Sequence, residues 1–155
     1  MSYNSATIAN IFWRLAAKDG IPVTNMSLQK LVYIAHGYFL AKRHQPLIEN
    51  NVNAFPYGPV IPTLYNRLKK YGSEKVTAPI DTLGRPVIDE DAEIVKAVWE
   101  GYKHLDALEL SSITHQNGTP WKKTWERDKY GVIPNDLIEN HYIELLHARK
   151  SIRAK

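Results

Sequence analysis

The chain has no cysteine among its 155 residues. This absence excludes disulfides, iron–sulfur clusters and thiolate zinc sites, and it fits a reducing compartment, so we expect a cytoplasmic protein. No apolar run approaches the roughly 20 residues that span a bilayer. The N-terminus also lacks the charged lead and apolar core of a secretory signal. We therefore expect a soluble protein with no membrane partner.

Catalytic and cofactor-binding motifs are missing as well. The chain has no GxSxG or HExxH motif and no glycine-rich phosphate loop. The six histidines are not at metal-site spacings, since His141 and His147 lie on different sides of a helix. Ser111 and Ser112 precede His115, but successive helical residues point about 100° apart, so nearness in sequence does not make a dyad. We predict a protein that is not an enzyme and that binds no metal or cofactor; an enzyme would need a site assembled from scattered residues.

The formal net charge of +4 is concentrated at one end. The last nine residues, HARKSIRAK, hold four bases and no acid, so residues 1–146 carry equal numbers of acids and bases. We interpret 146–155 as a basic C-terminal tail at a solvated helix end, where cations suit the helix dipole. Nucleic-acid binding remains an alternative, and it predicts an affinity that falls steeply with salt.

Length and composition indicate one compact domain over residues 1–155. The chain is 44% hydrophobic and 23% charged, without a repeat or linker. We expect a mainly α (α+β) fold of six or seven helices with a small β-hairpin or a two- to three-stranded sheet.

Helical periodicity and capping residues place the first three helices. Ser5 is expected to cap a helix that ends at Asp19–Gly20. A second helix begins near 25–27 and carries a core-facing stripe, in which His36 lies beside apolar residues and needs a hydrogen-bond partner. That stripe comprises Leu28, Leu31, Val32, Ala35, Tyr38 and Phe39. Pro62 opens a third helix that ends at Gly72.

Acidic residues and capping patterns place the remaining helices. Acids at 89–93 open a fourth helix with Val95 and Trp99 on its buried side. Asp106 and Glu109 form a capping-box pattern for a short helix running toward His115. Thr119–Pro120 begins another short helix, and Asp136 with Glu139 repeats the capping pattern ahead of the last one.

The strands are predicted from short apolar runs. Residues 52–55 read as an extended edge segment before Pro56. Residues 76–80 and 86–88 flank the turn 81–84, a pattern that predicts a hairpin of two short strands.

The stretch AFPYGPVIPTLYNRLKKYG, residues 54–72, holds three of the nine prolines. Proline fixes the backbone torsion φ, so this corner is either a stiff strand-to-helix connection or a preorganised binding surface. Beyond the core side of this helix stand Arg67, Lys69 and Lys70, which are candidates to meet an acidic patch on a partner. A charge reversal at Arg67 and Lys70 is expected to weaken binding without unfolding the domain.

A second candidate surface lies in PWKKTWERDKY, residues 120–130. Aromatic residues interleaved with bases can stack on single-stranded nucleic acid. Trp121 and Trp125 are, however, spaced i, i+4, which is typical of a core-facing pair. We favour core packing for this pair.

Three blocks carry a family resemblance: TNMSLQKLVYIAHGYFLA (24–41), NAFPYGPVIPTLYNRLKKYG (53–72) and LSSITHQNGTPW (110–121). In order and spacing they resemble the Panacea domain of antitoxins, a family that includes phage-associated GepA-like and SocA-like proteins. Phe55 and His36 are mild departures, where tryptophan and glutamine would also fit. The matching positions are Leu28, Gln29, Lys30, Leu31, Tyr33, Gly58, Pro59, Pro62, Leu64, Tyr65, Thr114, His115, Pro120 and Trp121.

The resemblance implies a type II antitoxin that neutralises a cognate protein toxin by direct binding, without catalysis. It implies a toxin encoded by the adjacent gene, often in a prophage. Two alternatives stay open: a proteolytic adaptor that delivers the toxin to an ATP-dependent protease, as in the SocA-like branch, or a nucleic-acid-binding prophage accessory protein. The candidate partner-binding residues are Tyr57, Tyr65, Arg67, Lys69, Lys70, Trp121, Lys122 and Trp125.

Overall fold

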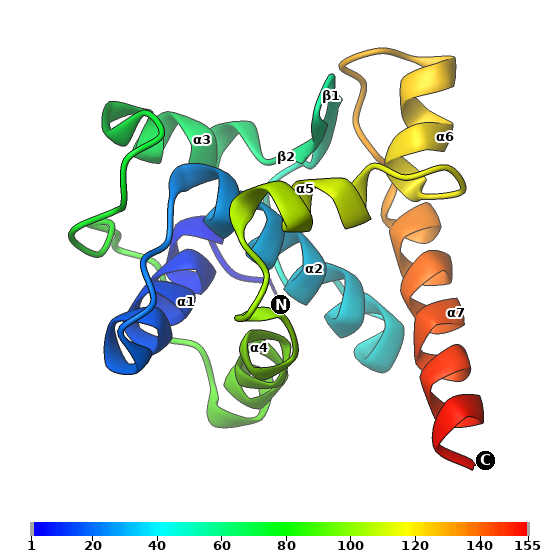
Figure 1. Cartoon of the computed structure of the whole chain (residues 1–155), viewed down its shortest axis with the longest axis horizontal. Coiled ribbons are helices and arrows are strands. Elements are labelled where there is room, and N and C mark those ends of the chain that lie inside the picture. The colour runs from blue at the N-terminus through cyan, green and yellow to red at the C-terminus, as the bar shows by residue number, and fades with distance from the viewer. Residues whose placement is uncertain (1, 155) are drawn as a thin grey trace.

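The computed structural model describes residues 2–154, with side chains up to residue 148. Over these residues the chain forms seven α-helices, one 3-10 helix and two short strands, which confirms the predicted mainly helical fold (Figure 1). In chain order the elements are α1 (Ser5–Asp19), α2 (Asn25–Arg43), β1 (Asn53–Phe55), β2 (Gly58–Val60), α3 (Pro62–Leu68), η1 (Lys69–Tyr71), α4 (Asp89–Tyr102), α5 (Ala107–Thr114), α6 (Pro120–Arg127) and α7 (Asn135–Ala154).

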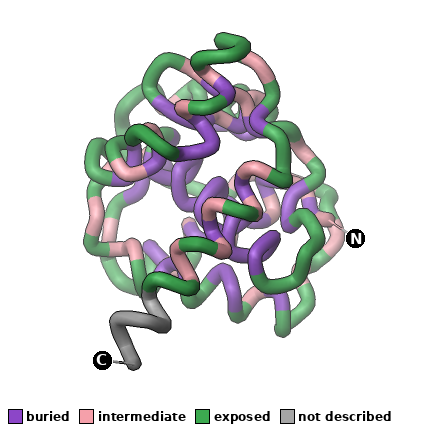
Figure 2. Tube along the Cα trace, turned by 90° about the vertical axis from the view of Figure 1, so that its right-hand side faces the viewer, coloured by how far each residue is buried: buried purple, intermediate pink, exposed green. Residues whose placement is uncertain are grey.

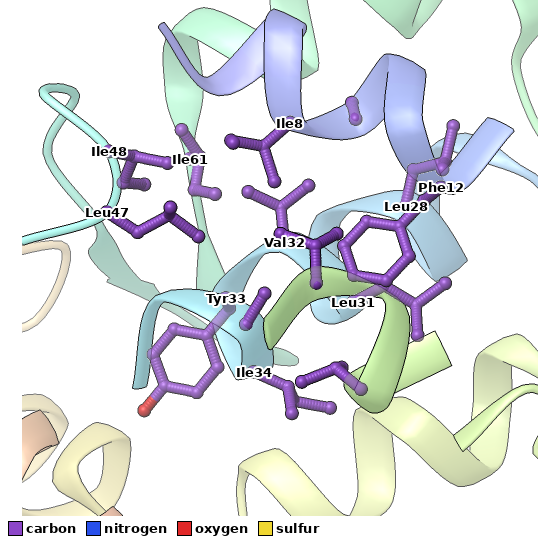
Figure 3. Close-up of a cluster of buried hydrophobic side chains, with 14 of the residues drawn as sticks. Ile8, Phe12, Leu28, Leu31, Val32, Tyr33, Ile34, Leu47, Ile48 and Ile61 are labelled. Atoms are coloured by element: carbon purple, nitrogen blue, oxygen red, sulfur yellow. The ribbon is translucent and has the colours of Figure 1, made fainter. Parts of the chain in front are cut away.

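Helix α2 forms the centre of the molecule. It packs against α1, α3, α4, α5, α7 and β2, so its buried surface extends well beyond one stripe. Figure 2 shows buried residues gathered in the interior and exposed residues around the outside. In Figure 3, Ile8 and Phe12 of α1 lie beside Val32 and Leu28 of α2. A helix buried on most sides is a rigid frame for the elements that surround it.

The caps of the helices follow the sequence patterns with two corrections. Asn4, and not Ser5, caps α1, because the Asn4 side chain accepts a hydrogen bond from the backbone N–H of Ala6 at 2.8 Å. The capping box predicted at Asp106 and Glu109 is present.

The box predicted ahead of the last helix is wrong. Helix α7 already begins at Asn135, so Asp136 lies inside its first turn and accepts from the N–H of Leu137. An aspartate in the first turn interacts favourably with the helix dipole, but it is not the N-cap residue, which precedes the helix.

The extended segment predicted at 52–55 is confirmed as β1, but the predicted hairpin is wrong. Residues 76–80 and 86–88 form no strands; the sheet consists of β1 and β2, antiparallel, with Ala54 opposite Pro59. The segment 76–80 lies along α1, where the Asn10 amide bonds both the N–H and the C=O of Ile80. Side chains thus satisfy the backbone groups that a strand partner would otherwise satisfy.

Helices α2 and α7 cross closely at Gly37. A Cβ placed on Gly37 would lie 2.8 Å from Cγ of Tyr142 and closer still to two other ring carbons. The same Tyr142 ring packs edge-on against Tyr38, with centroids 4.8 Å apart. Glycine is therefore required here for close approach.

Gly37→Ala is expected to destabilise the fold by about 1–3 kcal/mol, because the added methyl group overlaps the Tyr142 ring. This loss outweighs the roughly 1 kcal/mol that alanine gains over glycine in helix propensity. Gly101→Ala is the matched control, since a Cβ at Gly101 in α4 meets nothing within 4 Å. Urea unfolding followed by circular dichroism should show the two variants shifting in opposite directions; a shift in the same direction would contradict the close crossing.

The C-terminal tail continues α7. The backbone is helical to Ala154, while the side chains of Arg149, Lys150 and Arg153, and all of Lys155, lie outside the described residues. In the part of the chain that the structure describes, no helix combines the length and apolarity of a membrane span.

Candidate partner-binding groove

The hairpin formed by residues 53–60 is fastened to α2 by two polar side chains. Lys30 Nζ donates to the carbonyl oxygen of Pro59 at 2.6 Å. Gln29 Oε1 accepts from the backbone N–H of Ile61 at 2.8 Å, just past the hairpin. Both side chains are almost fully buried, so each bond satisfies a backbone group that water does not reach. The adjacent residues Gln29 and Lys30 thus hold the hairpin at a fixed distance from α2.

Two more side chains hold the hairpin from α5 and α6. Ser111 Oγ donates to the carbonyl of Tyr57 at 2.8 Å, at the hairpin turn. Trp121 Nε1 donates to the carbonyl of Phe55 at 2.6 Å. Side chains from three helices therefore bond the backbone of one short hairpin, which has little freedom to move.

The three blocks of the family resemblance meet at Gly58. Its φ is +118°, which side-chain-bearing residues rarely adopt. A Cβ at this position would lie 3.3 Å from Lys30 Nζ, 3.5 Å from His115 Cβ and 3.6 Å from Thr114 Oγ1. The hairpin, α2 and the end of α5 pack around this glycine.

Other positions of the family resemblance lie at helix starts or in the hydrophobic core. Pro62 and Pro120 stand at the first residues of α3 and α6. Leu28 is in the core. Tyr33 packs edge-on against Tyr142; its hydroxyl is buried and has no hydrogen-bond partner among the described residues, and burial raises its pKa.

Trp121→Phe is expected to cost about 1–2 kcal/mol of folding free energy, because it removes the N–H donor of a part-buried carbonyl while keeping an aromatic ring. Trp125→Phe is the control: the two rings stack at 5.7 Å, but no hydrogen bond from Trp125 Nε1 is present in the described structure. Chemical unfolding by circular dichroism compares them. Equal destabilisation would show that the bond to Phe55 contributes nothing.

A groove of about 640 Å³ lies between the hairpin, α3 and the first turns of α2 and α5. In Figure 1 these elements meet at the N-terminal end of α2. Four large apolar side chains line the groove and remain exposed: Met26 at 39%, Tyr57 at 76%, Tyr65 at 47% and Leu108 at 74%. Its volume is in the range of about 300–1,000 Å³ typical of binding pockets. Exposed apolar side chains gathered around a hollow are characteristic of recognition sites.

Among the described residues that line the groove, two are lysines and none is acidic. Lys30 lines it with 3% of its surface exposed, and Lys69 lines it as an exposed residue. Burial lowers the pKa of Lys30 to about 8, which still leaves the ammonium mostly protonated at neutral pH. In the described structure no carboxylate pairs with Lys30, and Pro59 O is the acceptor of its hydrogen bond.

The candidate partner-binding residues separate into three places. Tyr57, Tyr65 and Lys69 line the groove. Arg67 and Lys70 face the segment 78–81 instead, and Arg67 donates to the carbonyl of Asp81.

The third place is α6. Trp121 is 5% exposed and stacks on the half-buried Trp125, as the core-packing interpretation predicts. Lys122 pairs with Glu126 at 3.5 Å. Because Trp121 is buried, its indole has little surface to offer a partner. The i, i+4 spacing of Trp121 and Trp125 therefore indicated that the two rings pack against each other.

Ser111 and His115 do approach each other, at 3.4 Å between Oγ and Nδ1. Spacing of i, i+4 brings them to one helix face, which the argument from adjacent residues missed. Nδ1 also contacts the backbone carbonyl of Ser111, which requires the Nδ1–H tautomer, while the serine proton goes to Tyr57 O. An Nδ1 that carries a hydrogen cannot act as a base toward this hydroxyl. The described residues hold no group of three or more side chains suited to a metal ion.

Met26 and Leu108 are two exposed groove residues that sequence reasoning did not single out, and Ser111 was considered only as a possible catalytic residue and not as a contact of the hairpin. Leu108 offered a signal, since it lies off the buried face of α5 that includes Leu110 and Ser111. A large apolar residue off the core stripe of a short helix is a candidate contact. For Met26, at the exposed start of α2, no such signal exists.

The apolar groove beside the fastened hairpin has the size and lining of a binding site. Residues 28–122 match the family described as "Antitoxin SocA-like, Panacea domain", so the chain belongs to this family. It is 29% identical over 130 residues to Antitoxin SocA of Caulobacter vibrioides (strain NA1000 / CB15N), covering 77% of this chain and 69% of that protein. No solved structure matches the chain. Family membership supports an antitoxin role with a toxin as the partner in general, and it favours a regulatory role over an enzymatic one.

Proposed function

We propose that the chain is the antitoxin of a type II pair and neutralises a protein toxin by direct binding through the groove. The observation that carries the proposal is the gathering of four exposed apolar side chains, Met26, Tyr57, Tyr65 and Leu108, around one hollow. The chain acts in the cytoplasm, and its toxin is encoded by the adjacent gene.

Physical considerations support this face as an interface. Tyrosine is frequent among interface residues that contribute most to binding, and fully desolvated centres carry most of the free energy. A stable complex buries roughly 1,600 Å² in total, of which one small domain can supply half. The fastened hairpin holds Tyr57 in place before binding, which lowers the ordering cost.

The test is co-expression with the adjacent gene product, with growth and co-purification as readouts. Wild type should restore growth and co-purify with the toxin. Tyr57→Ser combined with Leu108→Ser should abolish rescue and weaken binding at least tenfold, because two apolar contacts are lost. Leu83→Ser is the matched control, as Leu83 is fully exposed and lies outside the groove. A harmless, non-binding gene product would overturn the proposal.

Charge reversal at Arg67 in α3 and Lys70 in η1 tests the surface beside the segment 78–81. Loss of rescue in that variant, with the Tyr57 and Leu108 variant still active, would move the interface from the groove to this surface. The half-life of the toxin separates occlusion from delivery to an ATP-dependent protease, since occlusion alone does not shorten it.

A further inference from the structure

Lys30 is buried, and among the residues that the structure describes no carboxylate pairs with its ammonium group. Buried charges in proteins are normally paired, because desolvating an ion costs far more than one neutral hydrogen bond returns. Lys30 Nζ has three N–H donors, and in the described residues one carbonyl, that of Pro59, accepts from it. Lys30 is also one of the residues that line the groove, so the remaining donors of its ammonium group are suited to an anion that enters the groove.

The groove itself narrows the chemistry of that anion. Its lining is largely apolar, with aromatic and aliphatic side chains on the walls and two lysines as its charged residues. A phosphate group would bring two negative charges into this largely apolar lining. A nucleic-acid site would present several basic side chains along a track. A carboxylate carries one charge and can be flanked by apolar side chains of the same peptide.

We propose that the groove binds an apolar segment of the toxin that carries an aspartate or glutamate, whose side-chain carboxylate pairs with Lys30 Nζ. This inference rests on the proposed function and names the chemistry of the partner at the same site. The apolar side chains of the segment contact Tyr57, Tyr65, Met26 and Leu108, and Lys69 at the exposed side attracts the acidic segment. Pairing supplies the counter-ion that the folded antitoxin lacks.

The bond to Pro59 does not by itself explain a lysine at this position. A carbonyl can be satisfied by many donors that carry no net charge, including the amide group that neighbouring Gln29 uses for Ile61. A buried charge costs free energy of folding unless it is paired. In this proposal the acid of the toxin supplies the pairing.

The test uses a random twelve-residue peptide library displayed on phage and selected on the full-length wild-type protein. Selected peptides should contain an aspartate or glutamate between apolar residues. A synthetic peptide of this kind should bind Lys30→Met at least tenfold more weakly than wild type. Changing its acid to the amide should weaken binding to wild type equally and should have little further effect on Lys30→Met. Lys42→Met, an exposed lysine on the same helix, should bind like wild type.

The amide peptide leaves the protein untouched, so the outcome does not depend on how well a variant folds. Selected peptides without an acid, or equal affinity for wild type and Lys30→Met, would overturn the inference. In the growth assay, failure of wild type to bind the toxin overturns the proposed function. Rescue by wild type and by Lys30→Met alike overturns only the role of Lys30.

Discussion

Lys30→Met should yield a protein that is at least as stable as wild type at pH 7 and that no longer neutralises its toxin. Methionine fills a similar volume without a charge. The variant loses the buried, charge-assisted hydrogen bond to Pro59, which costs about 1.5–3 kcal/mol. It also removes a buried ammonium whose desolvation, seen in its lowered pKa, costs about 3 kcal/mol and offsets that loss. Most core substitutions lose stability, so a core change that keeps stability and loses function identifies a functional position.

The cost of the buried charge can be measured from its pH dependence. The pKa of Lys30 is lowered by burial from 10.5 to about 8 in the folded protein. Between these two values the unfolded chain holds the proton and the folded chain does not, so stability rises with pH. The shift corresponds to about 3 kcal/mol, gained by wild type as pH rises from below 8 to above 10.5.

Urea unfolding of wild type and Lys30→Met at a series of pH values from 7 to 10.5 isolates this contribution, because the other titrating groups are common to both. The free energy of unfolding of wild type should rise relative to the variant by about 3 kcal/mol over this range. The difference between wild type and Lys42→Met should stay flat. A flat difference for Lys30→Met as well would mean that the ammonium is not desolvated in the folded protein.

Local patterns in the sequence were sufficient to predict the helices. Their boundaries depend on caps and prolines that act within a few residues, such as the box at Asp106 and Glu109 and the proline at residue 62. The predicted hairpin at 76–88 failed because its backbone partners are distant side chains. Asn10 and Trp13 of α1 bond to Ile80 and Val76, and no local pattern reports such a contact.

The groove shows the same division between local and long-range information. Tyr57 and Tyr65 were among the candidate partner-binding residues, and both line the groove. Lys30 was noted only as a position of the resemblance, because a lysine within an apolar helix reads as a residue that reaches solvent. Its burial follows from the hairpin lying across α2, a contact between residues 29 positions apart. Sequence periodicity carries no record of that contact.

His36 is expected to make the fold sensitive to acid. The imidazole is buried, and its Nδ1 accepts from the backbone N–H groups of Leu47 and Ile48 at 3.3 and 3.4 Å. Its Nε2 lies 3.0 Å from Asn135 Oδ1, an acceptor, which fixes the Nε2–H tautomer. The neutral ring thus joins α2 to the 47–48 segment and to the start of α7. A proton on Nδ1 would face two N–H donors.

Burial lowers the pKa of His36 from 6.5 to about 4, partly opposed by the hydrogen bond with Asn135. As pH falls from 6.5 to 4, this histidine binds a proton in the unfolded chain but not in the folded chain, so the free energy of unfolding decreases in this pH range. The shift corresponds to about 3 kcal/mol, a large share of the roughly 5–15 kcal/mol that holds a domain folded.

His36→Gln separates this contribution from the titration of carboxylates, because its amide offers a donor and an acceptor but takes up no proton. At pH 7.5 the variant should be less stable than wild type, because the substitution removes the hydrogen bonds of the imidazole. The difference in unfolding free energy between the two proteins should decrease by about 3 kcal/mol as pH falls to 4, because only wild type loses stability through its buried imidazole. His104→Asn, at an exposed histidine, should run parallel to wild type throughout. Parallel curves for His36→Gln too would show that the imidazole takes up its proton in the folded state, and that the three elements it joins are held by packing alone.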